Sequence, residues 1–187
     1  MSTQNKKIKT GFTDVMIDLE TCSTETNALI CTIGIVKFNL FDSNVIPQST
    51  TILVDKADAE NAGLHISEST MSWWERQPEE AKYEAFNKTP RLSLRSALDD
   101  CNAFCKGMER YWCQGTNFDV VVLEQAMKTV NVKPVWKFWQ WRDCRTISKM
   151  VQSLPKREGT HHSAEQDALY QVACLRHVFS TYNINSA

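Results

Sequence analysis

The order of strand-like and helical segments along the chain is the feature that most limits the possible folds. Three apolar stretches rich in β-branched and aromatic residues come first and predict strands at residues 13–18, 30–41 and 50–54. Helical spacing of apolar residues then marks four segments: one after Ser67, one from Ser93 toward Gly107, one over 119–129 and one over 164–179. Short strand-like stretches lie between the later ones, at residues 111–114 and 141–144. This order favours an α/β domain, with a central mixed β-sheet flanked by helices.

The size and composition of the chain favour one soluble domain. Its 187 residues are enough for one hydrophobic core and too few for two ordinary domains. A composition of 42% hydrophobic and 23% charged residues excludes disorder, collagen-like repeats and coiled coil. We expect a single domain over residues 1–187, with the polar residues 1–10 as a flexible N-terminal tail. Since no apolar stretch is long enough for a bilayer or a signal peptide, we expect a cytoplasmic protein without a membrane partner.

The charge balance excludes one class of nucleic-acid binder. Lysine and arginine total 21 against 22 aspartates and glutamates, so the chain lacks the bulk basic field that collects duplex nucleic acid. A nucleic-acid enzyme is still possible, because a site built from carboxylates adds negative charge that bound metal ions neutralise. The seven cysteines form an odd set without a C-x-x-C pair, which favours reduced, buried thiols over disulfides or zinc.

The first candidate for chemistry is a pair of carboxylates at the end of the first predicted strand. Asp18 and Glu20 are two residues apart, so in an extended strand they point to the same face, with Leu19 opposite. Two like charges so close together repel, and burial increases that cost, which a divalent cation would relieve. For an isolated D-x-E motif, a solvated strand end with two harmless acids is the more frequent explanation.

Two further segments carry acidic residues at ends of elements. In Gly115-Thr116-Asn117-Phe118-Asp119, a glycine-bearing turn follows a strand and Asp119 opens a helix, where a plain helix N-cap is the simpler explanation. Asp167 lies inside the apolar pattern of the last predicted helix, five residues after His162. A histidine on a loop near carboxylates can take a proton from water, although a surface pair with His161 would explain the segment too.

Taken together, these motifs resemble the DEDDh exonuclease superfamily with its RNase H-like fold. That superfamily, which includes oligoribonuclease, RNase T and the proofreading exonuclease of DNA polymerase III, has D-x-E, G-x-x-F-D and H-x-x-x-x-D in this order. The closer likeness is to the phage exonuclease A and RNase AS branch, which adds T after D-x-E, paired tryptophans, W-x-x-G-x-x-F-D and R-T. Here these motifs are Asp18 to Thr21, Trp73-Trp74, Trp112 to Asp119 and Arg145-Thr146, and the likeness spans residues 13–180. Gln114-Gly115 departs from the His-Asn of many members, which puts nucleotide contacts from that turn in doubt.

The resemblance implies an activity and a set of site residues. The activity is metal-dependent 3′-5′ hydrolysis of single-stranded DNA or RNA, which releases nucleoside 5′-monophosphates. Two Mg²⁺ or Mn²⁺ ions would be held by four carboxylates, with Asp18 bridging both. Glu20 and Asp167 would hold the ion that carries the attacking water, and Asp119 the other. His162 becomes the general base, whereas His161 has no matching role.

The resemblance also implies residues that hold the substrate. Leu19 and Thr21 would be neighbours of the terminal nucleotide, and Arg145 belongs to the same set. Trp73 and Trp74 cannot both face one side of a helix, so we expect one of them in the core and the other at the site. Aromatic faces hold single strands by base stacking, at roughly 1–3 kcal/mol per base.

Several alternatives stay open at the level of sequence. Residues 136–141, with Lys133, Lys137 and Arg142, are aromatic and basic, and they fit either substrate or a second subunit. Lys149, Lys156 and Arg157 flank the His162 loop and could hold phosphates. The competing function is a catalytically silent RNase H-like module that binds nucleic acid or a partner protein. A scaffold with accidental acids would need three ordered motifs by chance. Neither the sugar preference nor the oligomeric state is predicted, although homodimers are common in the superfamily.

Overall fold

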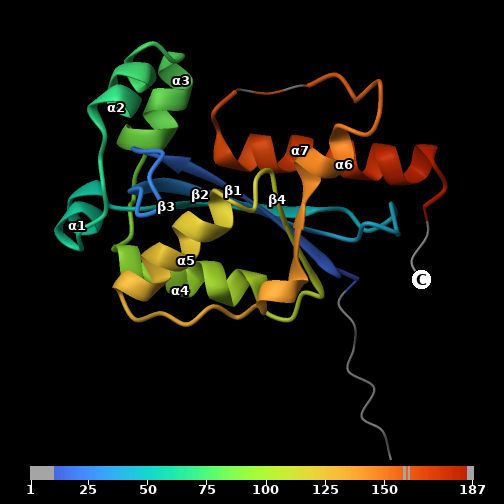
Figure 1. The fold of residues 1–187 in the computed structure, drawn as a ribbon, viewed down its shortest axis with the longest axis horizontal. Coiled ribbons are helices and arrows are strands. Elements are labelled where there is room, and N and C mark those ends of the chain that lie inside the picture. Colours follow the sequence, from blue (N-terminus) through green and yellow to red (C-terminus); the bar gives the residue numbers. More distant parts are fainter. Residues whose placement is uncertain (1–10, 158, 160, 185–187) are drawn as a thin grey trace, which may run out of the picture.

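Helices cover both faces of a mixed β-sheet (Figure 1). The structure, a computed structural model, describes residues 11–157, 159 and 161–184, so the tail expected at residues 1–10 lies outside the described part. Within these residues five strands form one sheet in the order β3-β2-β1-β4-β5. β1 is antiparallel to β2 and parallel to β4, β2 is antiparallel to β3, and β4 is parallel to β5. The strands are β1 (Asp14–Thr21), β2 (Ile30–Phe38), β3 (Gln48–Leu53), β4 (Arg110–Cys113) and β5 (Trp141–Asp143).

The helices lie in two layers, which confirms the predicted α/β class. α7 (Ala164–Thr181) covers one face of the sheet, while α4 (Leu94–Cys105) and α5 (Asp119–Thr129) cover the other (Figure 1). The remaining helical segments are short: α1 (Lys56–Asn61), α2 (Glu68–Glu75), α3 (Glu79–Lys82), the π-helical turn η1 (Tyr83–Asn87), the 3₁₀ turn η2 (Phe138–Gln140) and α6 (Cys144–Ser148). None of the helices in the described part of the chain has the length and apolar character needed to cross a bilayer.

The alternating side chains of β1 divide the core and aim the acidic pair. Val15, Ile17 and Leu19 belong to the larger core on the side of α4 and α5. Met16 belongs to the smaller core beneath α7. Because successive strand residues point to opposite faces, Asp18 and Glu20 face the α7 side, as the D-x-E spacing predicts.

A glycine in β2 lets α7 approach the sheet at this place. Gly34 pairs with Asp18 across the β1–β2 ladder. A Cβ atom at Gly34 would lie 2.1 Å from the backbone carbon of Ala164, the first residue of α7. Only glycine fits such a contact, so the first turn of α7, with Asp167, comes down onto the end of β1.

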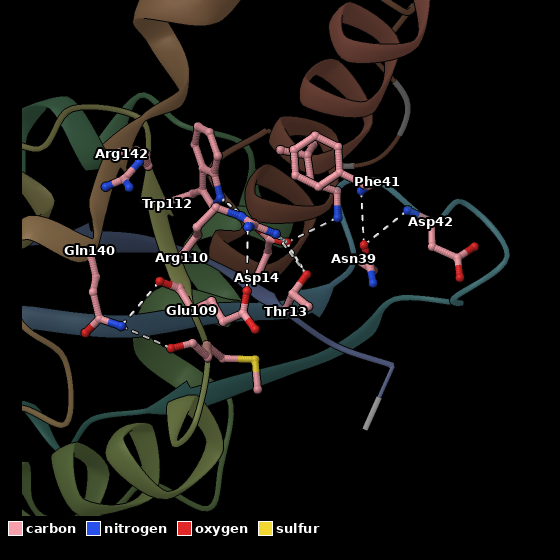
Figure 2. A network of polar contacts seen from close by, with 12 residues as sticks. Thr13, Asp14, Asn39, Phe41, Asp42, Glu109, Arg110, Trp112, Gln140 and Arg142 are labelled. Carbon is pink, nitrogen blue, oxygen red and sulfur yellow. Dashed lines mark hydrogen bonds and ion pairs between the residues drawn. The ribbon is translucent and has the colours of Figure 1, made fainter. Parts of the chain in front are cut away.

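At the other end of β1 a buried carboxylate is fully paired (Figure 2). Asp14 is buried and accepts hydrogen bonds from Nε and Nη2 of Arg110 at 2.6 and 2.7 Å. Nε1 of Trp112 donates to it at 2.9 Å, the Thr13 hydroxyl at 2.6 Å and the Leu40 backbone at 3.2 Å. This network holds β1, β4 and the end of β2 together, and Trp112 itself is buried.

Most differences from the predicted elements lie at boundaries and in short helices. β2 ends at Phe38 rather than at residue 41, because Oδ1 of Asn39 accepts from the Phe41 and Asp42 backbones and turns the chain. β3 begins at Gln48 and ends at Leu53. The strand expected at 141–144 ends at Asp143, because Cys144 is the first residue of α6. α1, α3, η1, η2 and α6 are too short to show a clear period in the sequence. The seven cysteines are buried and free, as predicted.

Candidate active site

Carboxylates from distant parts of the chain meet where β1 ends. Asp18 and Glu20 come from β1 and Asp167 from the first turn of α7, and one oxygen of each lies within 4.8 Å of the others. Asp119, the first residue of α5, lines a cavity of about 380 Å³ together with Asp18. Three separate elements therefore bring the four acids of the sequence motifs to one place.

The acids at this place carry more negative charge than the surrounding side chains balance. Burial raises the pKa of Glu20 to about 8, and the charges of Asp167 and Glu84 add to the effect. Burial raises the pKa of Asp119 to about 7, although backbone hydrogen bonds from Leu19 and from Asp119 itself act in the other direction.

Asp18 shows the same crowding most strongly. Its pKa is well above the usual value, first because of burial and then because of the charges of Asp119, Glu20 and Asp167. The contrast with Asp14 is direct, since Asp14 on the same face of the same strand has a guanidinium and three further donors. Crowded, undercompensated carboxylates of this kind are typical of a cation site.

Two polar side chains support the acids without neutralising all of them. Nε2 of the buried Gln171, one turn beyond Asp167 on α7, donates to Oδ1 of Asp18 at 2.6 Å. Nη2 of Arg157 donates to Oδ1 of Asp167, and the guanidinium also lies 5.3 Å from the centre of the Tyr170 ring. Arg157 therefore supplies one positive charge at the edge of the acidic group.

His162 lies beside the carboxylates in a constrained backbone conformation. Its φ of +62° is in the left-handed region, which is uncommon for residues other than glycine and is found at functional sites. Its backbone N–H donates to Oδ2 of Asp167 at 3.1 Å, and its ring packs edge-on against Trp73 at 4.7 Å. Burial lowers the pKa of the imidazole, which favours the neutral form that can accept a proton. His161 is exposed.

The paired tryptophans have different surroundings, and a role of Trp73 in holding substrate stays a prediction. Trp74 is 2% exposed, and its Nε1 donates to the backbone oxygen of Thr21 at 2.9 Å. Trp73 is half-buried and lines a cavity of about 430 Å³ next to the acids. Leu19 and Thr21 line this cavity as well. Its remaining lining residues are Glu20, Thr24, Ser69, Thr70, Trp74 and Phe118. A larger cavity, of about 580 Å³, lies away from the acids between β3 and α4.

Arg145 lies on the other side of Asp18. It is exposed, lines the cavity that contains Asp18 and Asp119, and its Nη2 donates to the backbone oxygen of Gln114 at 2.8 Å. Asp143 joins this region together, because its carboxylate accepts from the Arg145 backbone at 2.8 Å and from the Thr116 backbone at 3.2 Å. Asp143 was not among the predicted site residues, although an aspartate before a short helix is a recognisable N-cap signal.

Glu84 is a further residue that the sequence motifs do not contain. Its Oε1 accepts from the hydroxyl of Ser163 at 2.8 Å, directly after His162 in the chain. Its backbone oxygen accepts from Nη2 of Arg91 at 2.9 Å, which anchors the π-helical turn η1. π-helical turns are frequent at functional sites, but nothing in the sequence marks this one.

Comparison with known proteins gives this arrangement a family. A family model described as the 3′-5′ exoribonuclease Rv2179c-like domain matches residues 13–179, nearly the whole chain. The chain belongs to this family. No curated protein matches it. Among solved structures, the nuclease domain of 3′hExo, described as a DEDDh family member bound to rAMP, has a similar fold. The TM-score is 0.60 at 12% identity, covering 92% of this chain and 94% of that one.

These findings confirm part of what the sequence motifs imply. The Rv2179c-like family membership confirms the DEDDh 3′-5′ exonuclease superfamily, and the structural likeness confirms the RNase H-like exonuclease fold. The chain is therefore a nuclease. The likeness to the phage exonuclease A branch stays a prediction, as do the individual site residues.

Proposed function

We propose that this Rv2179c-like chain is a metal-dependent 3′-5′ exonuclease that shortens single-stranded nucleic acid and releases nucleoside 5′-monophosphates. The observation that supports this most is the meeting of Asp18, Glu20 and Asp167 within 4.8 Å, next to Asp119. Family membership supports the direction of hydrolysis. The protein would act through a histidine base and a pair of divalent ions.

The residues fit Mg²⁺ or Mn²⁺ better than other metals. The candidate ligands are all carboxylate oxygens, which suit hard divalent ions, and no cysteine belongs to the group of possible ligands found among the described residues. The raised pKa values of Glu20 and Asp119 also fit, because the cost of crowding these charges falls once cations are bound. Asp18, Glu20 and Asp167 would hold one ion, and Asp18 with Asp119 the other. When bound, two such ions stabilise both the attacking and the leaving oxygen of a phosphodiester.

His162 would remove a proton from the attacking water. A general base must be neutral before the reaction, and burial lowers the pKa of this imidazole. Trp73 against its ring and Asp167 on its backbone N–H limit the orientations that the side chain can take. The hydrogen bond from Ser163 to Glu84 holds the residue that directly follows His162 in the chain.

The cavity beside Trp73 would receive the 3′-terminal nucleotide. Its lining combines an aromatic face with the hydroxyls of Thr21, Ser69 and Thr70. The ring of Trp73 offers a stacking surface for a base, while Trp74 is buried and forms part of the cavity wall. Arg145 would contact the phosphate on the far side of Asp18.

One observation favours a silent RNase H-like binding module instead. The guanidinium of Arg157 pairs with Asp167, so a protein cation already occupies one oxygen of a proposed ligand. The presence of every acid and of the histidine supports the enzyme, because a module that only binds would not need them together. Arg157 would then leave Asp167 when an ion binds.

A 5′-labelled single-stranded oligonucleotide separates the two proposals. With Mg²⁺ the enzyme would produce a ladder of products shortened from the 3′ end, and chelator would stop it. Asp18→Asn is the matched inactive control. A protein that binds the oligonucleotide without shortening it, in Mg²⁺ and in Mn²⁺, is the silent module. Parallel DNA and RNA arms would give the sugar preference, and light scattering would show whether the protein is a monomer or a homodimer.

A further inference from the structure

One stretch of the chain concentrates positive charge and aromatic rings, and only its last residues, Asp143 to Arg145, belong to the site described above. Residues 133–145, here called the β5-edge segment, contain four basic residues and a single acid in a chain whose net charge is −1. That acid, Asp143, is already engaged as the cap of α6. The segment also contains four aromatic residues: Trp136, Phe138, Trp139 and Trp141.

The aromatic residues of this segment divide into an inner and an outer pair. Trp136 and Trp141 pack against Tyr111, with ring centres 5.5 and 5.7 Å away, and belong to the core. Phe138 and Trp139 are 83% and 61% exposed, and their rings pack edge-on at 5.0 Å. The outer pair therefore adds little to the core, and large exposed aromatic residues side by side are a usual mark of a binding surface.

The sheet register connects this surface to the acidic residues. Met16, Trp112 and Arg142 form one row across β1, β4 and β5, so Arg142 shares the face that carries Asp18. Two strand spacings and two residues along β1 put Arg142 about 12 Å from Asp18. Arg145 closes the gap, since it lines the cavity of Asp18 and Asp119.

The basic and aromatic residues continue from Arg142 to the outer pair. Nη1 of Arg142 donates to the backbone oxygens of Trp139 and Trp141 at 2.7 and 2.8 Å, which ties the guanidinium to η2. If the path is followed from Arg142 back along the chain through Trp141 into η2, the outer pair lies about 20 Å from Asp18. Lys137, which directly precedes Phe138 in the chain, is exposed, and so is Lys133.

We propose that the β5-edge segment binds the single-stranded substrate upstream of the nucleotide being removed. This inference rests on the proposed exonuclease function. Arginine and lysine would contact the phosphates, and Phe138 and Trp139 would stack on bases. At the 3.4 Å rise of a stacked strand, a path of about 20 Å holds roughly six nucleotides at most.

The positive charge of the β5-edge segment favours nucleic acid over a second copy of the chain as the molecule that binds there. A twofold dimer interface puts the same patch on both subunits against itself. Here that would bring four basic residues of one copy toward the same four of the other, at a cost in repulsion. A polyanion such as single-stranded nucleic acid would instead be attracted by these four positive charges.

The test is the dependence of KM on oligonucleotide length. For the wild-type protein KM should fall as the substrate grows from two to about six nucleotides and then level off. The double variant Phe138→Ala, Trp139→Ala should lose this fall, so that its KM for a ten-nucleotide substrate rises about 10-fold or more, with kcat unchanged. Its KM for a dinucleotide should stay the same. Ile46→Ala, at another 83% exposed apolar residue, is the matched control.

A second measurement tests the charges. Lys137→Gln should reduce the slope of log KM against log salt by about 0.7, the value for one phosphate contact on a single strand. An active double variant with wild-type length dependence would overturn the inference and leave the exonuclease function standing. If light scattering showed that the wild type is a dimer and the double variant is not, with KM unchanged, the inference would also be overturned, because a second copy would then cover the surface. An inactive wild-type protein would overturn the proposed function itself.

Discussion

At the scale of single residues, β1 shows how one strand can hold acids for two different purposes. Asp14 and Asp18 point to the same face of the sheet and lie four residues apart. Asp14 has Arg110, Trp112 and two further donors, so its buried charge is compensated within the protein. Asp18 has Gln171 and otherwise faces other carboxylates. A buried acid without enough donors is costly, and such a cost is usually retained for a ligand.

The first prediction at this scale concerns Asp167. Asp167→Asn should lower kcat by at least about a thousand-fold, because the amide cannot hold a divalent ion in the same way. The fold should persist, since the amide oxygen can still accept from the His162 backbone. Activity on a labelled oligonucleotide and the thermal midpoint, measured on the same preparation, check both parts. Metal-dependent activity near the wild-type level would refute the role given to Asp167.

The second prediction uses the raised pKa of Glu20. Because this pKa rises from its usual 4.5 to about 8, the folded state binds more protons than the unfolded chain between these values. The metal-free protein should therefore lose stability as pH rises from 4.5 to 8. In chelator at pH 8, Glu20→Gln should have a higher Tm than the wild type, at ~2–4 °C for each kcal/mol gained.

The Tm difference between Glu20→Gln and the wild type should depend on pH and on Mg²⁺. The difference in Tm should shrink as pH falls through 4.5, because below that pH the wild-type carboxyl is protonated in both states. It should reverse in millimolar Mg²⁺, which binds the folded wild type more tightly than the folded variant and so stabilises the wild type more. A glutamine variant that is less stable than the wild type at pH 8 in chelator would contradict the crowding of charge at Glu20.

At the scale of elements, the contact between α7 and β2 sets the position of Asp167. Gly34→Ala would place a methyl group 2.1 Å from the Ala164 backbone, which must then move. We expect a loss of stability of about 3 kcal/mol or more, and weaker Mg²⁺ binding because Asp167 moves away from β1. Calorimetry for Mg²⁺ and a denaturant titration would measure the two effects.

Gly63→Ala is the matched control for this substitution. Nothing lies within 4 Å of a Cβ there, so its cost is that of a positive φ alone, about 1–2 kcal/mol. It should leave Mg²⁺ binding unchanged. If Gly34→Ala bound Mg²⁺ as tightly as Gly63→Ala, the close approach at Gly34 would have no part in building the site.

The bond between η1 and the start of α7 leads to a prediction on positioning. Glu84→Ala should lower kcat by about 10-fold with KM unchanged, since Ser163 loses its partner and His162 is less fixed. Glu84→Gln keeps an oxygen acceptor and should restore most of kcat. Adding Ser163→Ala to Glu84→Ala should cost little more, because both remove one bond. Additive losses, or no rescue by glutamine, would exclude this role.

The sequence predicts the elements and motifs that carry a local signal. The long helices and β1, β2 and β4 follow from apolar periodicity, and the D-x-E spacing correctly predicts the face of Asp18 and Glu20. Glu84 and Gln171 were not found, because their partners are 79 and 153 residues away and no local pattern records such pairs. Gly34 did carry a signal, since a glycine inside a strand often marks a close backbone approach.

At the scale of the whole molecule, the sheet brings together segments that are far apart in the chain. β1 supplies two acids at residues 18 and 20, α5 supplies Asp119 from one helical layer, and α7 supplies Asp167 from the other (Figure 1). Each segment alone has an ordinary explanation, as a strand end, a helix cap or a helix start. The account therefore depends on all four acids holding cations together.

Diffraction from crystals grown with Mn²⁺ and a nucleoside 5′-monophosphate, recorded at the manganese absorption edge, tests this most directly. We expect two anomalous peaks about 3.5–4 Å apart, bound by oxygens of Asp18, Glu20, Asp119 and Asp167. The Arg157 side chain should then have left Asp167. Crystals without any peak among these four carboxylates would contradict the account.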